Sequence, residues 1–206
     1  MAGFGANYPC FKPEAQDAGV VLGKLVSANL TVNLATGELY ADDSLAEQVS
    51  EFSSGSIAME TDDMTDENAG VVYGCTVSDG LVTYNKNDTP PRGILGYYKV
   101  LMRSGKKFFK SYAYPRTCAA LGNDNAQTRG SSITFTTSNT TFTVFADDKG
   151  DWRLTKTFDS AEEARAWVNE KCGISDAQAA AAVAAIDEDD AESDQSDTGD
   201  PDAAED

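Results

Sequence analysis

The sequence predicts an α+β fold, with a mostly antiparallel sandwich or barrel-like sheet and one or two packed helices. Three observations lead to this prediction. Apolar and polar residues alternate with a period of two in several segments, which is typical of half-buried strands. Turn residues separate neighbouring segments, and helix-capping patterns occur at only a few places. The 17 glycines and 9% aromatic residues also suit a folded β-rich domain in a chain of 206 residues.

The first half of the chain contains a predicted hairpin. Residues 28–34 alternate Ala, Leu and Val with Asn and Thr, and the Ala-Thr-Gly at 35–37 predicts a turn. Residues 38–41 then predict the returning strand. The next segment, 45–53, fits either a capped helix or a strand. A further strand is predicted over 55–60.

The second half of the chain predicts more β-structure. The clearest feature is a long hairpin that turns at Ser104-Gly105. A later pair of strands is predicted to turn at Ser138-Asn139. The strands of this half are predicted at 93–103, 106–112, 133–137, 142–146 and 152–155.

Helices are predicted at three places by their terminal residues. Thr65 caps a short helix that ends at Gly74. Ser160 and Glu163 form a capping box for a helix that continues to Cys172 and stops at Gly173. An Ala-rich run predicts a short, frayed helix from about 176 to 186.

The chain divides into three predicted parts. Residues 1–21 form an N-terminal arm, and residues 22–173 form the β-rich domain. Residues 174–206 form the Ala-rich segment followed by an acidic tail. The last 20 residues contain 11 acids, no base and no aromatic residue, so they cannot bury enough apolar surface to fold and are predicted to be disordered.

Composition excludes several classes of function. The formal charge is −18 and the chain has no histidine, which removes Ser–His–Asp catalysis and His-containing zinc sites. Strong negative charge also disfavours general binding to nucleic acids and anionic membranes. The four cysteines form no CxxC pair, so reduced thiols in a cytosolic protein are predicted. We expect neither a signal peptide nor a membrane span.

No motif predicts an active site, a cofactor or a metal. The doublets Asp42-Asp43, Asp62-Asp63 and Asp147-Asp148 contain the two carboxylates that glycosidases need, but adjacent residues of a strand point to opposite faces. The acidic run at 147–151 lacks the alternating ligand spacing of an EF-hand loop, so a hairpin turn explains it better. We therefore predict that the protein is not an enzyme.

Charge is distributed unevenly along the chain and suggests a contact between subunits. Residues 1–85 contain 13 acids and two bases, whereas residues 86–116 contain eight bases and one acid. We expect a basic hairpin to contact the acidic stretches 42–51 and 60–67 of a neighbouring chain. A solvated outer face is the alternative. The candidate interface residues are Lys99, Arg103, Lys106, Lys107, Lys110, Asp42, Asp43, Asp62 and Asp63.

Three segments in order resemble the major tail proteins of long-tailed bacteriophages, the tube-forming subunits of the phi13-type family. These segments are GELYADDSLAEQVSEFSSGSIAMETDDMTDENAGVVYG at 37–74, GILGYYKVLMRSGKKFFKSYAYPRT at 93–117 and SSITFTTSNTTFTVFADDKGDWRLTKTFDSAEEARAWV at 131–168. The resemblance spans about residues 22–172. It implies the tail-tube fold and an extended 45–53 segment, and it supplies no catalytic residues.

The resemblance also implies a function and partners. Subunits of this family form stacked hexameric rings around a channel that conducts DNA during ejection without binding it specifically. The implied partners are the tape-measure protein, the tail terminator and the distal tail protein, in the virion tail and earlier in the host cytoplasm, with no membrane. A tube from a related secretion or injection apparatus is one alternative. An unassembled β-rich binding module or a carboxylate-based hydrolase is another.

Overall fold

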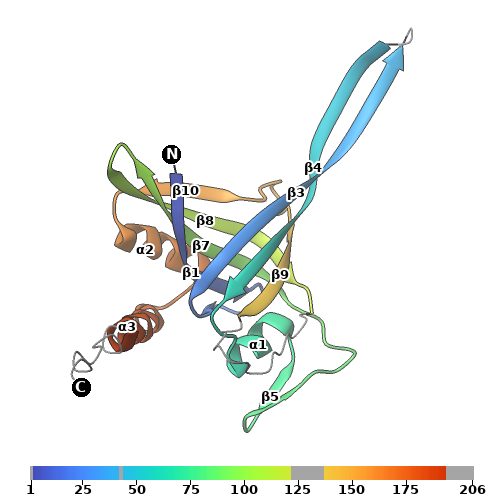
Figure 1. Ribbon diagram of the computed structural model, residues 1–206. Coiled ribbons are helices and arrows are strands. Elements are labelled where there is room, and N and C mark those ends of the chain that lie inside the picture. Colours follow the sequence, from blue (N-terminus) through green and yellow to red (C-terminus); the bar gives the residue numbers. More distant parts are fainter. Residues whose placement is uncertain (1, 42–43, 122–136, 194–206) are drawn as a thin grey trace, which may run out of the picture.

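The computed structural model describes residues 2–41, 44–121 and 137–193, which form a mostly antiparallel α+β structure as predicted (Figure 1). One sheet has eight strands and a second, small sheet has two. The large sheet contains β1 Ala2–Pro13, β2 Val20–Val21, β3 Leu25–Ala41, β4 Ser44–Thr61, β7 Arg92–Arg103, β8 Lys106–Ala119, β9 Ser138–Phe145 and β10 Leu154–Phe158. The small sheet contains β5 Thr76–Ser78 and β6 Leu81–Thr83.

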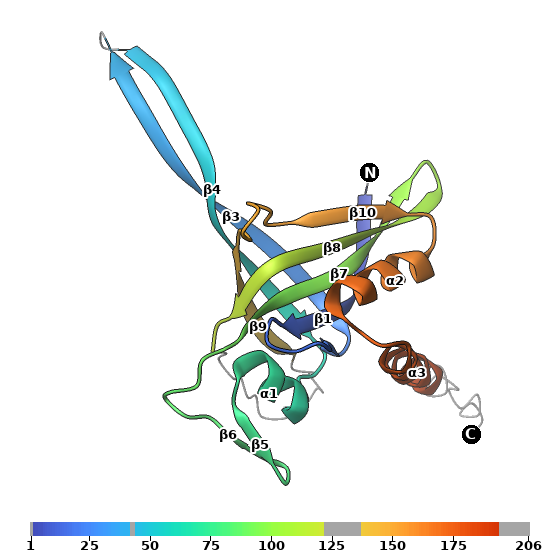
Figure 2. The same cartoon turned by 180° about the vertical axis from the view of Figure 1, so that it is seen from behind.

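The large sheet branches at β8. Its strand order is β2-β1-β7-β8-β9-β4-β3, and β10 pairs with β8 outside this path. The middle of β8, from Phe109 to Ala113, pairs with β10, whereas its last residues pair with β9. β1 and β3, near the two ends of the path, also contact each other, so the sheet curls around a core (Figure 2).

Two predictions about the strands were wrong. The turn expected at 35–37 is absent, because β3 continues through it and pairs antiparallel with β4 as far as Ala41. The segment 45–53 is therefore extended, as the resemblance implied. Ser138 and Asn139 lie in β9 and pair with β4 instead of forming a turn. The predicted strand at 133–137 lies almost entirely outside the described residues.

The N-terminal segment, predicted as an arm outside the β-rich domain, supplies two strands of the sheet. β1 pairs along most of β7, from Ala2 opposite Met102 to Pro13 opposite Gly93. Left-handed backbone at Gly5 and Tyr8, near two register shifts, interrupts this pairing. These irregularities, together with the small residues around them, hide the alternating pattern that would otherwise reveal a strand.

The predicted helices are confirmed, and the last one is longer than predicted. α1 spans Asp66–Tyr73, with Thr65 accepting a hydrogen bond from the backbone N–H of Asn68 at 3.3 Å. α2 spans Ala161–Cys172, with Ser160 and Gly173 at its ends. α3 spans Asp176–Ser193, so it extends past residue 186 into the segment predicted to be disordered. Residues 194–206 lie outside the described residues.

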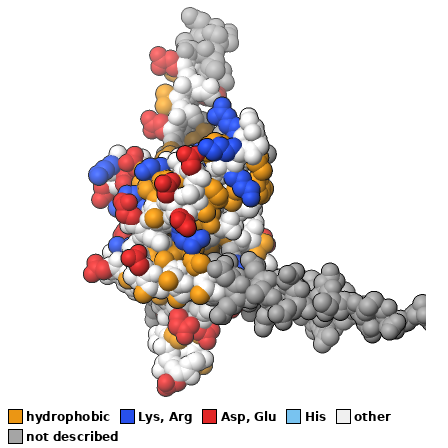
Figure 3. Space-filling view, turned by 90° about the vertical axis from the view of Figure 1, so that its left-hand side faces the viewer, with side chains coloured by type: hydrophobic (Ala, Val, Ile, Leu, Met, Phe, Trp, Pro, Cys, Tyr) orange, Lys and Arg blue, Asp and Glu red, His pale blue; other side chains and the backbone are white. Residues whose placement is uncertain are grey.

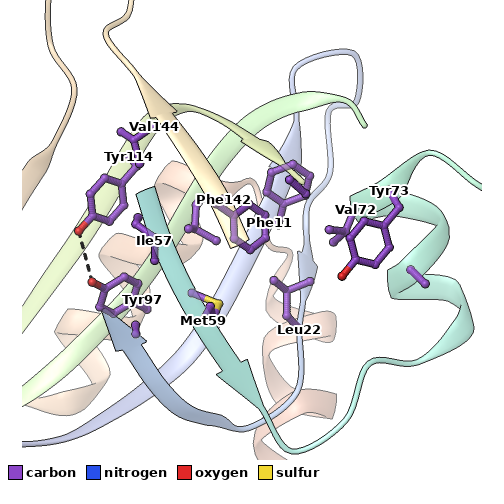
Figure 4. Close-up of a cluster of buried hydrophobic side chains, with 14 of the residues drawn as sticks. Phe11, Leu22, Ile57, Met59, Val72, Tyr73, Tyr97, Tyr114, Phe142 and Val144 are labelled. Carbon is purple, nitrogen blue, oxygen red and sulfur yellow. Dashed lines mark hydrogen bonds between the residues drawn. The ribbon is translucent and has the colours of Figure 1, made fainter. Parts of the chain in front are cut away.

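Two buried clusters cover opposite faces of the β1-β7-β8 region. The inner core contains Tyr97, Phe142 and Ile57, and α1 closes one end of it (Figure 4). The second cluster packs α2 against the outer face of β1 and β7. Gly96 permits this close approach, because a Cβ there would lie 2.8 Å from the Cys172 Sγ atom.

Candidate assembly surfaces

Four of the predicted basic residues lie on one face of the β7–β8 hairpin. Lys99 is paired with Lys110, and Arg103 is paired with Lys106. Because alternate residues of a strand share a face, all four face the side opposite α2. We call this surface the basic-aromatic face; it consists of Lys99, Arg103, Lys106, Phe108, Lys110 and Tyr112, and it adjoins the buried Tyr97. The fifth predicted base, Lys107, is opposite Met102 and therefore lies on the other face.

The bases of this face contact aromatic rings. The Lys99 Nζ atom lies 5.8 Å from the ring centres of both Tyr97 and Tyr112, and the Lys110 Nζ atom lies 5.6 Å from Tyr112. Burial raises the pKa of Tyr97 and Tyr112, so the rings stay neutral and do not cancel the lysine charges. Two lysines directly opposite each other repel. The face therefore suits an acidic partner.

The only ion pair that the structure gives these bases within the described residues is weak. Lys106 lies 3.7 Å from the Asp159 carboxylate, and both side chains are largely exposed. Exposed pairs of this kind contribute about 0–1 kcal/mol. Most of the positive charge of the face is thus not matched by a close carboxylate among the described residues.

The β3–β4 hairpin continues beyond the sheet as an arm, which we define as residues 33–54. β9 pairs with β4 only from Gly55 to Thr61, so within the described residues the two arm strands pair only with each other (Figure 1). Nine residues of β3, from Asn33 to Ala41, extend about 30 Å at the usual rise per residue. The arm has five acids and no base in its sequence. Acidic side chains are visible along it in Figure 3.

Apolar side chains on the arm are exposed. Leu34 is 56% exposed, Leu39 58% and Val49 55%. Where the arm leaves the sheet, Phe52 stacks on Trp152 with ring centres 4.5 Å apart. An isolated two-stranded hairpin is only marginally stable in water, so an arm with exposed apolar residues suits contact with another surface.

The predicted acidic residues are not all equivalent. Asp42 and Asp43, which connect β3 and β4 in the sequence, lie outside the described residues. The Asp62 Oδ1 atom accepts hydrogen bonds from the backbone N–H groups of Lys24 at 2.7 Å and Asp63 at 2.8 Å. Asp63 in turn accepts from the N–H of Met64 at 2.7 Å. Asp62 and Asp63 therefore fix the turn before α1, at the end of the sheet opposite the β7–β8 turn.

The outer edge of β3 has no pairing partner in the part of the chain that the structure describes. β3 is 17 residues long, pairs only with β4, and contains no proline or lysine. At the other end of the sheet, β2 covers only Cys10 and Phe11 of β1. Proteins usually protect such edges with charges, prolines or short strands. The sequence does not reveal this edge, because the turn composition of residues 35–37 indicates an earlier end of the strand.

Comparisons with known proteins do not assign this chain to a family. Neither models of known protein families nor curated proteins gave a match to this sequence. Among the described residues, no three Cys, Asp or Glu side chains are grouped to hold a metal ion. Within the same residues, no helix has the length and apolar character needed to cross a membrane. All four cysteines are unpaired.

Proposed function

We propose that the protein is a structural, non-enzymatic subunit of a bacteriophage tail tube, which polymerises as stacked hexameric rings around a DNA-conducting channel. The curled sheet would then be the barrel-like tail-tube fold that the sequence motifs resemble. The observation that carries this proposal is the outer edge of β3, which pairs with no strand of the described residues and whose last nine residues belong to the arm. A monomer that exposes such an edge is prone to pair with further chains.

The free edges differ from each other, and this favours a ring. β3 exposes a long edge at one end of the sheet, and the first residues of β1 expose a shorter edge toward the other end. Pairing of one edge with the other in a neighbour is a heterologous contact. Such contacts generate closed rings when the rotation between neighbours closes. Six subunits per ring is what the family resemblance implies.

We infer that the arm of one subunit binds the basic-aromatic face of another subunit. The arm points away from its own body (Figures 1 and 2), so the acids near its tip lie far from the bases of the same chain. Glu47 and Glu51 are exposed on the arm. Opposite charges on two surfaces set the register of a contact and speed association. Asp62 and Asp63 already hold a turn, so we assign them a smaller part in this contact.

The proposal includes the partners that the resemblance implies: the tape-measure protein, the tail terminator and the distal tail protein. The subunit would act in the virion tail, after assembly in the host cytoplasm. A tube from a secretion or injection apparatus would use the same subunit contacts. Recovery of the assemblies from intact virions distinguishes the phage tail from that alternative.

Electron microscopy of the purified chain tests the proposal. We expect rings or tubes in negative stain at high protein concentration, and large particles by light scattering. The double variant Lys99→Glu/Lys110→Glu should stay folded by circular dichroism but lose polymerisation, because it reverses the charge of the basic-aromatic face. Lys107→Glu is the matched control, since it changes a lysine on the opposite face of the same hairpin, and it should assemble normally.

Further experiments test the arm contact and the proposed tube function separately. Restored assembly when Lys99→Glu/Lys110→Glu subunits are mixed with Glu47→Lys/Glu51→Lys subunits would support the arm contact. Normal tubes from the lysine double variant alone would refute that contact while leaving the tube itself intact. A wild-type protein that stays monomeric at every concentration, with no tube of this chain in any virion, would refute the proposed function.

A further inference from the structure

The pairing of β3 with β4 is irregular at the root of the arm. Asn33 is paired with Ser54, whereas Leu34 is paired with Phe52. Ser53 therefore has no partner on β3, and this extra residue is a β-bulge, which bends a strand and increases its local twist. The bulge also places Phe52 against the inner core, because strict alternation along β4 would put that ring on the outer side.

Phe52 stacks on Trp152, which belongs to the body of the molecule. The ring centres are 4.5 Å apart, and the ring planes differ by 7°. The Arg153 guanidinium carbon lies 4.7 Å from the centre of the same indole ring. Both stacked rings are half-buried and pack against the inner core. The stack therefore joins the arm residue next to the bulge to the body.

The loop that leads to Trp152 is closed by its own hydrogen bonds. It connects β9 to β10 and contains the acidic run at 147–151. The Asp147 Oδ1 atom accepts hydrogen bonds from the backbone N–H groups of Lys149 and Asp151, both at 2.8 Å. The Asp147 N–H donates to the Asp151 carbonyl at 2.8 Å. Asp147 thus has a structural role, and Trp152 follows directly after the closed loop.

Arg116 on β8 anchors this loop to the sheet. Its Nη1 atom donates to the Ala146 carbonyl at 3.5 Å and to the Asp148 carboxylate at 3.0 Å. Its Nε atom donates to the Glu14 carboxylate at 3.3 Å. The loop is therefore tied to the body, and the indole ring that follows it supports the arm from a fixed position.

The direction of the arm matters because the arm is long. Since the arm extends about 30 Å, a rotation of about 20° at its root would move its tip by about 10 Å. An ion pair needs its charged atoms within about 4 Å of each other. A small change of direction would therefore take the acids of the arm out of reach of the bases that they are proposed to contact.

We propose that Trp152 is a positioning residue for assembly: its stack with Phe52, beside the bulge at Ser53, sets the direction in which the arm leaves the body. Preorganisation of a binding segment lowers the entropy that is lost on contact. The use of the arm in assembly rests on the proposed function. The direction of the arm is a property of the single subunit and can be measured without assembly.

Distances between two spin labels in the unassembled subunit test the inference. Leu39→Cys places one label on the arm, where the native side chain is 58% exposed, and Glu162→Cys places the other on the exposed side of α2. Both changes are made in a Cys118→Ser background, because the other three native cysteines are buried. Double electron–electron resonance, at a protein concentration too low for assembly, gives the distribution of distances between the labels.

A single narrow distribution is expected in this background. Trp152→Ala should make the distribution about twice as wide, because the arm can then turn at the bulge. Trp152→Phe keeps an aromatic partner for Phe52 and should give the original width. Tyr84→Ala is the matched control, since it removes a 60% exposed ring beside the small sheet, and it should leave the distribution unchanged.

Urea unfolding distinguishes positioning from a purely structural role. If the stack only covers the end of the inner core, Trp152→Ala will lower the stability but leave the distribution narrow, and this result would overturn the inference. A distribution that is already broad with Trp152 in place would also overturn it. If Trp152→Ala does not fold by circular dichroism, Phe52→Ala removes the other ring. Failure of both variants to fold would assign the pair to the core and overturn the inference.

Assembly separates this inference from the proposed function. If the wild type forms tubes, Trp152→Ala should raise the protein concentration at which tubes appear by about tenfold, and Trp152→Phe should not. Unchanged assembly of Trp152→Ala would overturn the role of Trp152 in assembly while leaving the tube itself intact. If the wild type forms no tubes, the proposed function fails, and the distances between the labels still decide whether the stack sets the direction of the arm.

Discussion

The two long hairpins of the sheet, β7–β8 and β3–β4, are both antiparallel pairs of long strands. They differ in how much of their length is covered by other parts of the chain. The β7–β8 hairpin lies between α2 on one face and the inner core on the other along much of its length. The β3–β4 hairpin reaches the core only in its first part and then continues as the bare arm. The basic hairpin is thus held from both sides by its own chain, whereas the acidic one is not.

This difference separates residues that stabilise the subunit from residues that are available for contacts between subunits. Tyr97 on β7 is 1% exposed, whereas Leu34 on the arm is 56% exposed. Buried side chains contribute to the free energy of unfolding in proportion to the surface they remove from water. Changes on the two hairpins should therefore affect two different measurements.

The largest effect on stability is expected from Tyr97→Ala. Tyr97 packs between Tyr112 and Tyr114, with ring centres 5.2 and 6.1 Å away. Removing a buried aromatic side chain leaves a cavity and costs about 3–5 kcal/mol. Urea unfolding followed by circular dichroism measures this loss. A loss below about 1 kcal/mol would contradict the assignment of this hairpin to the core.

An intermediate effect is expected from alkaline pH. Burial raises the pKa of Tyr8 from 10.0 to about 12 and that of Cys172 from 9.0 to about 12. The folded chain therefore holds these protons more tightly than the unfolded chain does, and stability falls as pH rises. The urea midpoint should be constant up to about pH 9 and fall between pH 9 and 12.

A pair of variants checks the source of this pH dependence. Cys172→Ala removes one of the buried groups and should make the fall in the urea midpoint less steep. Cys118→Ser changes a thiol that is only partly buried and serves as the control, with the profile of the wild type. The same slope in both variants would show that the Cys172 thiol does not contribute.

The smallest effect on stability is expected from shortening the arm. Leu34 is paired with Phe52, so residues 35–51 can be replaced by an Asn-Gly turn, which suits a two-residue hairpin connection. The free energy of unfolding should change by no more than about 1 kcal/mol, because an isolated hairpin is only marginally stable. Polymerisation should nevertheless be lost. Tubes of normal length from this variant would show that the arm is not needed for assembly.

The sequence predicted the elements that depend on local signals. α1 and α2 were predicted with nearly correct ends, because Thr65, Ser160, Gly74 and Gly173 cap them locally. The β7–β8 turn was predicted for the same reason. Ser104 and Gly105 both have positive φ angles, 50° and 77°, which a tight hairpin turn requires.

Pairings between distant segments could not be predicted in the same way. β1 pairs with β7 across about ninety residues, and no pattern in the N-terminal segment indicates that partner. The residues at 35–37 have turn composition, yet pairing with β4 keeps them extended. Tertiary pairing thus prevailed over local propensity.

The sequence predicted which charged residues form the candidate assembly surfaces, but not how these residues are arranged in space. The sequence identified the basic hairpin and the acidic stretches, which are features of composition. It could not show that Lys107 lies on the opposite face from the other four bases, because that depends on the register of the hairpin. Nor could it show that Asp62 accepts hydrogen bonds from two backbone N–H groups.

The uniform charge of the arm limits how two subunits can meet. Two arms placed side by side in a two-fold symmetric dimer would bring five acids against five acids and no base, and the like charges would repel. A closed dimer through the arms is therefore disfavoured, and each arm has to find a surface that differs from itself. Contacts of this kind have a direction. A polymer built from them has two different ends, and it can grow from one end while the other is capped.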